Sequence, residues 1–306
     1  MPGTDDSTQN ASDSLHDSAP ELARSSPIPP GLLLVATPIG NLGDISARAL
    51  QALRQSELIL CEDTRTTARL LHHYGIAVPT SPLHDHNEDA RIPGVLERLR
   101  AGARIAVVSD AGTPLVSDPG YRLVRAAAAE NLPVSAIPGP NAAVLALTLS
   151  GLPPHPFLFL GFPPPKQGAR QAGFAALRAI ERAGLSATLI WHEAPHRLAD
   201  TLADLASAFG DRPAAVAREL TKRFEEIRRG PLADLAAHYA ANAARGEITV
   251  VVGPAPAEAA DAEGLDSQLT RALETHSVKD AAALVAAATG LPRRTVYARA
   301  LELARV

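Results

Sequence analysis

The chain has 306 residues, enough for two domains with separate hydrophobic cores. Its single cysteine, Cys61, excludes an internal disulfide and is typical of proteins from a reducing compartment. No apolar run approaches the roughly 20 residues of a membrane-spanning helix, and the N-terminus lacks the basic flank and apolar core of a signal peptide. We therefore expect a soluble, cytoplasmic protein with no membrane partner.

The formal net charge of −4 is concentrated at the N-terminus. Residues 1–30 hold five acidic residues and one arginine, a net −4, so residues 31–306 are neutral overall. The charge balance of the larger part therefore neither favours nor excludes a nucleic-acid partner. Because residues 1–30 are also rich in Ser, Asp and Pro and offer little to bury, we predict that they form a disordered tail.

Short apolar runs alternate with helical segments over residues 31–151 and predict an α/β domain. The first buried strand, Gly31–Ala36, is stopped by a turn rich in Pro and Gly, and Asp44 or Ser46 caps the helix that follows, which ends near Gln55. The further predicted elements are strand Leu58–Cys61, helix Thr64–Tyr74, strand Arg104–Val108, helix Tyr121–Asn131, strand Val134–Ile137 and a final helix from Ala142 to Ser150.

A second α/β domain is predicted over residues 152–255, after a proline-rich linker. Its predicted strands are Phe157–Phe162, Thr188–Trp191, Ala214–Ala217 and Glu247–Val252. Residues 266–306 form a helical appendage in which one helix ends at Gly290 and another starts at Pro292, with Arg293 and Arg294 in its first turn. That pattern is typical of a helix-turn-helix that contacts nucleic acid; the alternative is a helical hairpin that packs on the body or on a partner subunit.

Three turns rich in Gly and Pro follow three separate strands of the first domain. They are Thr37–Asp44, Ser109–Gly120 and Pro138–Ala142, and none has the G-x-G-x-x-G spacing of a dinucleotide-binding loop. Ligands of open α/β sheets bind outside the carboxyl ends of the strands. Three such turns, with Asp110 and Asn141 among them, therefore predict the floor of a site for a small polar ligand.

The segment His192–His196 matches the H-E-x-x-H pattern of zinc proteases. A zinc site of that kind needs both histidines on one face of a helix, but Pro195 interrupts such a turn and a predicted strand precedes it. We instead predict a strand-to-helix turn in which Pro195 is the first residue of a helix that extends to Phe209. No metal site is expected.

Two polar segments carry groups that could act on a substrate. His84–Glu88 forms either a solvated loop with a helix cap or a set of substrate contacts and acid–base groups. The run Ala217–Glu226 leaves a strand, and its Arg218, Lys222 and Arg223 would suit phosphate groups. The alternative for this run is a solvated loop or helix.

Seven of these motifs together resemble those of one known family: Leu34–Ile45, Cys61–Arg65, His84–Glu88, Ser109–Gly120, Pro138–Asn141, Glu193–Arg197 and Arg218–Lys222. The chain is similar in them to ribosomal RNA small subunit methyltransferase I, in the tetrapyrrole methylase superfamily. The resemblance covers residues 31–306 and leaves out residues 1–30. Ala194 stands where serine is common in the family, a departure that leaves every candidate catalytic and binding residue in place.

The resemblance implies two α/β domains of the tetrapyrrole methylase type (class III methyltransferase) and the small helical appendage, usually as a homodimer. S-adenosyl-L-methionine would lie in the cleft between the domains. The implied reaction is 2′-O-methylation of a cytidine ribose in 16S rRNA near the decoding centre, on the small ribosomal subunit, at cytidine 1402 in standard rRNA numbering. The implied cofactor-binding residues are Pro38, Gly40, Asn41, Asp110, Ala111, Gly112, Thr113, Gly139, Pro140, Asn141, Leu160, Gly161 and Ala217.

A ribose hydroxyl is a poor nucleophile, so a base or a polarising cation should accelerate the transfer, by roughly 10²–10⁴-fold. The candidate catalytic residues are Glu62, Asp63, His84 and Lys222, with His86 and Glu88 beside them, and the sequence leaves the choice open. The candidate RNA-binding residues are Arg65, Arg218, Arg223, Arg293 and Arg294. We expect Asp110 to accept a hydrogen bond from the cofactor's ammonium group or ribose hydroxyl.

Two alternative functions remain open. One is methylation of a corrin or porphyrin, against which the basic C-terminal helices and the Glu62–Arg65 motif speak. The other is a catalytically silent RNA-binding factor in ribosome assembly, which would bind the cofactor without turnover.

Overall fold

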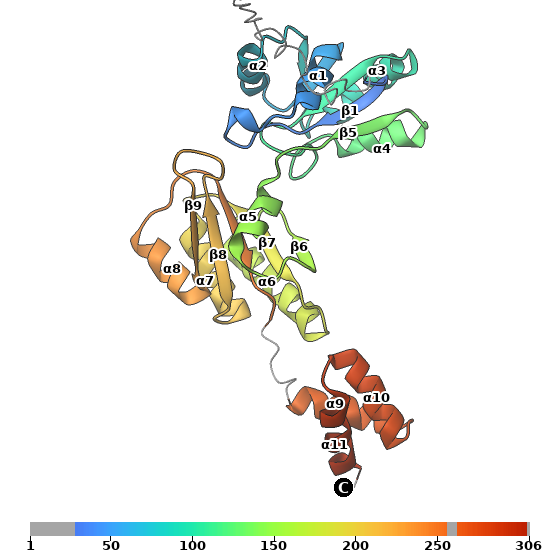
Figure 1. Cartoon of the computed structure of the whole chain (residues 1–306), viewed down its shortest axis with the longest axis vertical. Helices are drawn as coiled ribbons and strands as arrows, with labels where there is room; N and C mark the ends of the chain where they lie inside the picture. Colours follow the sequence, from blue (N-terminus) through green and yellow to red (C-terminus); the bar gives the residue numbers. More distant parts are fainter. Residues whose placement is uncertain (1–27, 256–261, 305–306) are drawn as a thin grey trace, which may run out of the picture.

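Two α/β domains are followed by a separate group of three helices in the computed structural model, which describes residues 28–255 and 262–304 (Figure 1). The predicted fold class is therefore confirmed. Most of the predicted N-terminal tail, residues 1–27, lies outside the described residues. Ile28 is already buried in the first core, and its carbonyl accepts a hydrogen bond of 2.9 Å from Arg104 Nε.

The first domain is built on a parallel five-stranded sheet of order β3-β2-β4-β1-β5. Its strands are β1 (Gly31–Val35), β2 (Leu58–Cys61), β3 (Thr80–Pro82), β4 (Arg104–Val108) and β5 (Val134–Ile137). The central strands are apolar at nearly every position because both faces of the sheet are covered. In β1, Leu33 and Val35 enter one core while Leu32 enters the core on the opposite face.

Helices cover both faces of this sheet: α1 (Ala47–Gln55), α2 (Thr64–His73), α3 (Glu88–Arg100) and α4 (Tyr121–Ala129). The faces of α1 and α2 pack into one core and those of α3 and α4 into the other. Of the two predicted caps, Asp44 and Ser46, it is Ser46 that caps α1, by accepting a hydrogen bond from the Ala49 N–H. The sequence interpretation omitted α3, because Pro93 and Gly94 interrupt its helical pattern.

The second domain has a mixed five-stranded sheet of order β6-β7-β10-β8-β9, in which only β6 and β7 run parallel. The strands are β6 (Phe157–Phe159), β7 (Thr188–Glu193), β8 (Pro213–Arg218), β9 (Glu226–Pro231) and β10 (Ile248–Val252). Strand β9 was not predicted, since it is an edge strand with charged side chains.

Three helices, α6 (Gln167–Arg182), α7 (Leu198–Phe209) and α8 (Leu232–Ala241), cover one face of the second sheet. The other face is covered by α5 (Ala142–Ser150), which lies within the predicted first domain. Ala146 and Leu147 of α5 join a core with Ala215 and Val251. The domains therefore meet along α5, and the boundary after residue 151 stays a prediction.

The C-terminal helices α9 (Ala262–Leu273), α10 (Val278–Thr289) and α11 (Arg293–Leu303) pack around a core of their own. Helix α10 ends at Gly290, whose φ of +68° is left-handed, and Pro292 precedes α11. The predicted helix–turn–helix is present. Within residues 28–255 and 262–304, no helix combines the length and apolar character needed to cross a membrane.

Candidate functional site

The predicted floor of three turns exists as a hydrogen-bonded unit. At the end of β1, the Thr37 N–H donates to the Gly112 carbonyl (2.9 Å) and the Gly112 N–H donates back to Thr37 (3.1 Å). The Thr37 hydroxyl donates to the Ser109 carbonyl at 3.0 Å. These bonds fix the first turn against the loop that follows β4.

The third turn joins the same unit through side chains. The Thr113 hydroxyl donates to the Pro140 carbonyl (3.1 Å), and the Asn141 amide donates to the Thr113 hydroxyl (3.3 Å). Asn141 also caps α5 by accepting from the Val144 N–H. The ends of β1, β4 and β5 are thereby held together at one edge of the sheet.

The loop after β4 stores backbone strain. Leu115 and Ser117 have φ values of 71° and 68°, in the left-handed region that side chains other than glycine rarely adopt. Such residues cost of order 1–3 kcal/mol each and concentrate at functional sites. Ser117 and its neighbours Val116 and Asp118 line a cavity.

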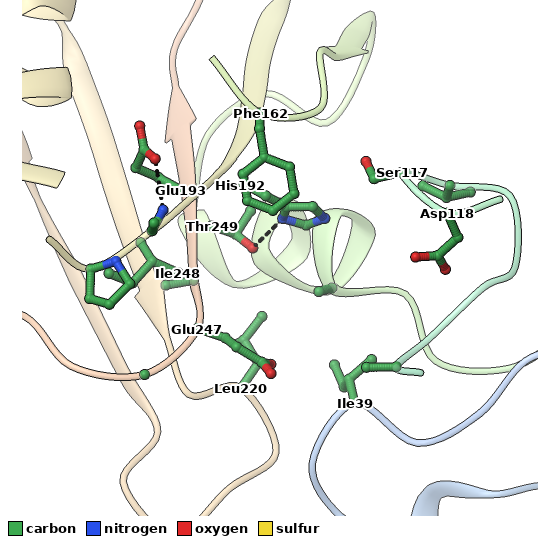
Figure 2. Close-up of a pocket in the computed structure, with 17 residues that line it drawn as sticks. Ile39, Ser117, Asp118, Phe162, His192, Glu193, Leu220, Glu247, Ile248 and Thr249 are labelled. Atoms are coloured by element: carbon green, nitrogen blue, oxygen red, sulfur yellow. Dashed lines mark hydrogen bonds between the residues drawn. The ribbon is translucent and has the colours of Figure 1, made fainter. Parts of the chain in front are cut away.

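A cavity of about 350 Å³ lies between the two domains (Figure 2). The strained loop and the turn after β1 form one wall, and the ends of β7, β8 and β10 form the other. The lining residues are Ile39, Ala111, Val116, Ser117, Asp118, Ala142, Phe162, His192, Glu193, Ala194, Pro195, Ala217, Leu220, Gly246, Glu247, Ile248 and Thr249. Such a volume suits a small molecule, and most of its walls are apolar.

His192 is a half-buried titratable side chain that lines this cavity. A hydrogen bond of 3.0 Å joins its Nδ1 to the Thr249 hydroxyl, on the neighbouring strand. Its ring packs against Phe159 and Phe162. Burial lowers the pKa of His192, so the imidazole is neutral at neutral pH. Figure 2 shows its other nitrogen facing the cavity, on the side of Ser117.

Asp118 faces His192 from the opposite wall (Figure 2). Burial raises the pKa of its carboxyl, a contact with Ser109 partly offsets this, and the charge of Asp110 raises it further. Within the described part of the chain, Asp118 Oδ2 is buried without a hydrogen-bond partner. A ligand with an N–H or O–H donor would satisfy that oxygen.

The H-E-x-x-H segment forms no zinc site. Its first two residues belong to strand β7, the described residues contain no metal-binding cluster, and helix α7 begins only at Leu198. The prediction that Pro195 is the first helical residue is therefore wrong. The buried Glu193 carboxylate explains the longer turn, since it accepts from the Ala194 N–H (2.7 Å) and pairs with Arg197.

A second cavity of about 290 Å³ adjoins the first and shares Ile39, Ala111 and Glu247 with it. The predicted cofactor residues Pro38, Gly40 and Asp110 line this second cavity instead. The Asp110 carboxylate accepts a hydrogen bond of 3.1 Å from the Asp63 N–H. Asp110 thus fixes the start of α2 against the loop after β4.

Lys222 closes the second cavity from the other domain. Its ammonium contacts Glu219 (2.9 Å) and Glu247 (3.1 Å). Burial alone would lower the pKa of Lys222, but the hydrogen bonds to these two glutamates outweigh it and raise that pKa. Its stem lies on Gly40, where a Cβ would stand 2.4 Å from Lys222 Cγ. Gly40 thus permits the close contact between the domains.

The other predicted cofactor residues surround the cavities without all lining them. Gly139, Pro140 and Asn141 line a shallow pocket with Val144 on the outer side of α5. The Gly161 carbonyl accepts a hydrogen bond of 2.9 Å from the His192 N–H, and the Leu160 N–H donates to the Ile190 carbonyl of β7. Of the predicted set, Ala111 and Ala217 line the larger cavity.

Known proteins resemble this chain in both of its parts. A family model described as tetrapyrrole (corrin/porphyrin) methylases matches residues 31–236, and a model of a C-terminal helix-turn-helix domain of the RsmI type matches residues 258–304. A protein named ribosomal RNA small subunit methyltransferase I from Mesorhizobium japonicum is 47% identical over 90% of this chain and 93% of its own. Its namesake in Pseudomonas aeruginosa is 45% identical over 89% and 96%.

The chain belongs to the ribosomal RNA small subunit methyltransferase I family of tetrapyrrole methylases.

Solved structures agree with this methylase fold. The methyltransferase CobJ superimposes with a TM-score of 0.55 at 20% identity, over 74% of this chain and 95% of that one. A uroporphyrin-III C-methyltransferase from Thermus thermophilus, solved in complex with S-adenyl homocysteine, gives a TM-score of 0.50 at 18% identity, over 72% and 96%.

The candidate catalytic side chains of this methylase differ in the hydrogen bonds and ion pairs that they already make. The Asp63 carboxylate caps α2 and pairs with Arg65, whose hydrogen bond lowers the pKa of Asp63. Glu62 is exposed, and no hydrogen bond to its carboxylate occurs within the described residues. Its carboxyl is nevertheless partly removed from water, which raises the pKa of Glu62, and the charges of Asp110 and Asp118 raise it further.

The cluster His84–Glu88 combines a helix start with an exposed loop. Asn87 immediately precedes α3, and its side chain accepts from the His84 N–H (2.9 Å). Glu88 is buried, accepts from the Leu123 N–H and pairs with Arg122, so its role is structural. His84 Nδ1 is buried without a hydrogen-bond partner in the described part of the chain, and the centroids of the His84 and His86 rings lie 6.1 Å apart.

Only some of the predicted RNA-binding arginines are free. Arg218 pairs with Glu226 at 2.9 Å and Arg65 pairs with Asp63. Three others are exposed and pair with no carboxylate among the described residues: Arg223, Arg293 and Arg294.

Several residues that line the larger cavity were not predicted as site residues, among them Phe162, His192, Gly246, Glu247, Ile248 and Thr249. His192 was considered only as a zinc ligand. The available signal was its place at the end of a buried strand, the same signal that identified the turns of the first domain.

Gly40→Ala tests the contact between the domains. The added methyl would displace the Lys222 stem from its two glutamates, so we expect the free energy of unfolding to fall by about 1–3 kcal/mol. Denaturant unfolding measures it. The control is Gly173→Ala in α6, where the new Cβ meets no atom within 4 Å and should stabilise by roughly 0.5–1 kcal/mol. Equal behaviour of the two variants would contradict the packing of Lys222 on Gly40.

Proposed function

We propose that this chain transfers a methyl group from S-adenosyl-L-methionine to the ribose 2′-hydroxyl of a cytidine in 16S rRNA, near the decoding centre of the small ribosomal subunit. The observation that carries the proposal is the match to rRNA small subunit methyltransferase I relatives over about nine-tenths of both chains. That match includes the C-terminal helices as well as the two methylase domains. The homodimer that the family resemblance implies stays a prediction.

The larger cavity fits the proposed cofactor in chemistry. When bound, S-adenosyl-L-methionine supplies an electrophilic methyl group on a sulfonium. Apolar side chains such as Ile39 and Leu220 would pack against its adenosine, and the small Ala217 leaves room for it. The unpartnered Asp118 carboxylate oxygen suits an ammonium or hydroxyl donor, and neutral His192 offers a hydrogen-bonding nitrogen. This ligand carries no diphosphate, which agrees with the absence of G-x-G-x-x-G spacing from the three turns of the first domain.

Among the four candidate catalytic residues, we assign the general base to Glu62. Lys222 is held as a cation by two glutamates, and Asp63 is engaged with Arg65 and carries a lowered pKa. Glu62 has an unengaged carboxylate with a raised pKa, which brings it closer to the value a base needs. His84 stays the second candidate. To Lys222 we assign the attraction of phosphate or the stabilisation of negative charge.

The methyl-transfer experiment uses small ribosomal subunits from a strain that lacks this gene. We expect the purified protein to transfer a labelled methyl group from S-adenosyl-L-methionine, and nuclease mapping to place it on a cytidine ribose of 16S rRNA. A methyl group on a base would contradict the proposed chemistry. Transfer to uroporphyrinogen instead of subunits would favour a porphyrin methylase, and cofactor binding without turnover would favour a silent assembly factor.

Glu62→Gln removes the proposed base without changing the size of the side chain. We expect kcat on subunits to fall by roughly 10²–10⁴-fold while S-adenosylhomocysteine binding, measured by calorimetry, is kept. The wild-type rate should fall as the pH drops through the pKa of Glu62, because only the carboxylate accepts a proton. Since that pKa is raised, the acid limb should lie above the ordinary value of about 4.3. The control is Glu97→Gln in α3, which should keep the wild-type kcat. A kcat for Glu62→Gln equal to that of the control would exclude Glu62 as the base.

A further inference from the structure

Exposed aromatic side chains are unexpectedly frequent on this molecule. The chain has only 6 Phe, 4 Tyr and 1 Trp. Three of these rings are more than half exposed: Tyr121 (62%), Phe162 (56%) and Phe224 (65%). Singly exposed apolar residues are common on protein surfaces, so the neighbours of these rings decide whether they mark a site.

The first of them, Tyr121, is paired with an arginine. Its ring lies 5.9 Å from the Arg125 guanidinium, one turn along α4. Both residues line a pocket of about 390 Å³ that also contains Asp118, and Asp118 lines the larger cavity as well. Arg125 is exposed and pairs with no carboxylate within the described residues.

Phe224 forms a second pair of the same kind on the other domain. The Arg223 guanidinium lies 5.5 Å from its ring, in the turn between β8 and β9. Leu220, four residues earlier, lines the larger cavity, and Lys222 lines the second one. Each arginine–aromatic pair is thus attached to a segment that forms a wall of the site, one on each domain.

The charges around these arginine–aromatic pairs determine which kind of ligand they can bind. Near the first pair, the strand ends carry Glu62, Asp110 and Asp118, whose mutual repulsion contributes to the raised pKa of Glu62. These charges repel the phosphates of a polyanion, so only the target ribose would approach Glu62, while the flanking nucleotides are held at the rim. The free guanidinium groups of Arg125 and Arg223 lie next to rings that can stack on a base, so each pair offers one contact for a phosphate and one for a nucleobase.

We propose that Tyr121 with Arg125, and Phe224 with Arg223, form two stacking clamps for unpaired nucleotides on either side of the methylated one. The inference rests on the proposed function and adds the form of the substrate: a single-stranded RNA segment whose flanking bases are splayed onto the two rings. A-form duplex RNA buries its base faces and cannot stack on protein rings in this way. The clamps act on any base, because every base has a stacking face.

The test measures binding of fluorescein-labelled oligouridylate by fluorescence anisotropy, with and without a complementary strand. We expect the single strand to bind the full-length protein more tightly than the duplex. Tyr121→Ala and Phe224→Ala should each weaken single-strand binding by roughly 5- to 150-fold, since one stacked base contributes about 1–3 kcal/mol. Tyr121→Phe and Phe224→Trp should restore it. The matched control is Phe157→Ala, which removes an exposed ring (41%) on strand β6 that lines neither cavity.

Single-strand binding by both alanine variants equal to that of Phe157→Ala would overturn the proposal, as would equal losses for single strand and duplex. Unchanged binding of S-adenosylhomocysteine by the variants shows that they are folded. Oligouridylate offers no cytidine to methylate, so this result is independent of the methyl-transfer assay. A protein that methylates subunits but shows no stacking loss contradicts the clamps alone.

Discussion

The pair of backbone hydrogen bonds between Thr37 and Gly112 is the constraint on which the site depends. It joins the turn after β1 to the loop after β4, the two neighbouring strands at the centre of the first sheet. Gly112 adopts a φ of +92° there, which a residue with a side chain rarely does. With Thr113 bonded to Pro140, the third turn is added. Three flexible strand ends thereby become one rigid wall, and rigidity lets the loop retain its strained residues.

The second wall comes from a sheet of different construction. The ends of its strands β7, β8 and β10 supply His192, Ala217 and Thr249 to the cavity. Two features hold this wall against the first: α5, which leaves the third turn and covers the second sheet, and Lys222, whose stem rests on Gly40. The cavity is therefore a property of both domains together, and its polar groups face one another across the domain boundary (Figure 2).

Much of the fold followed from local patterns in the sequence. Buried parallel strands give continuous apolar runs such as Ile105–Val108, and a cap such as Ser46 marks a helix start, so these elements were predicted at nearly their observed bounds. Two of the elements that were missed depend on contacts between residues distant in the sequence. Helix α3 is stabilised by its packing despite Pro93, and edge strand β9 by its pairing with β8.

The site shows the same division. The turns of the first domain were predicted because Gly, Pro and Asp mark them locally. His192 also lies at the end of a buried strand, but only the fold shows that the second sheet faces those turns and so brings His192 and Phe162 into the site. Asp110 was predicted as a ligand contact, and that role stays a prediction. The structure adds a role that depends on a residue distant in sequence, because Asp110 Oδ1 accepts a hydrogen bond from the Asp63 N–H.

The central claim is that the cavity between the domains holds the methyl donor. Calorimetric titration of S-adenosylhomocysteine into two leucine variants of α5 tests it most directly. Ala142 lines the cavity, whereas Val144, on the same helix, is 46% exposed and lies outside it. Filling the cavity in Ala142→Leu should weaken binding by at least about tenfold, or about 1.4 kcal/mol, while Val144→Leu should bind as the wild type does. Wild-type affinity in Ala142→Leu would contradict the account.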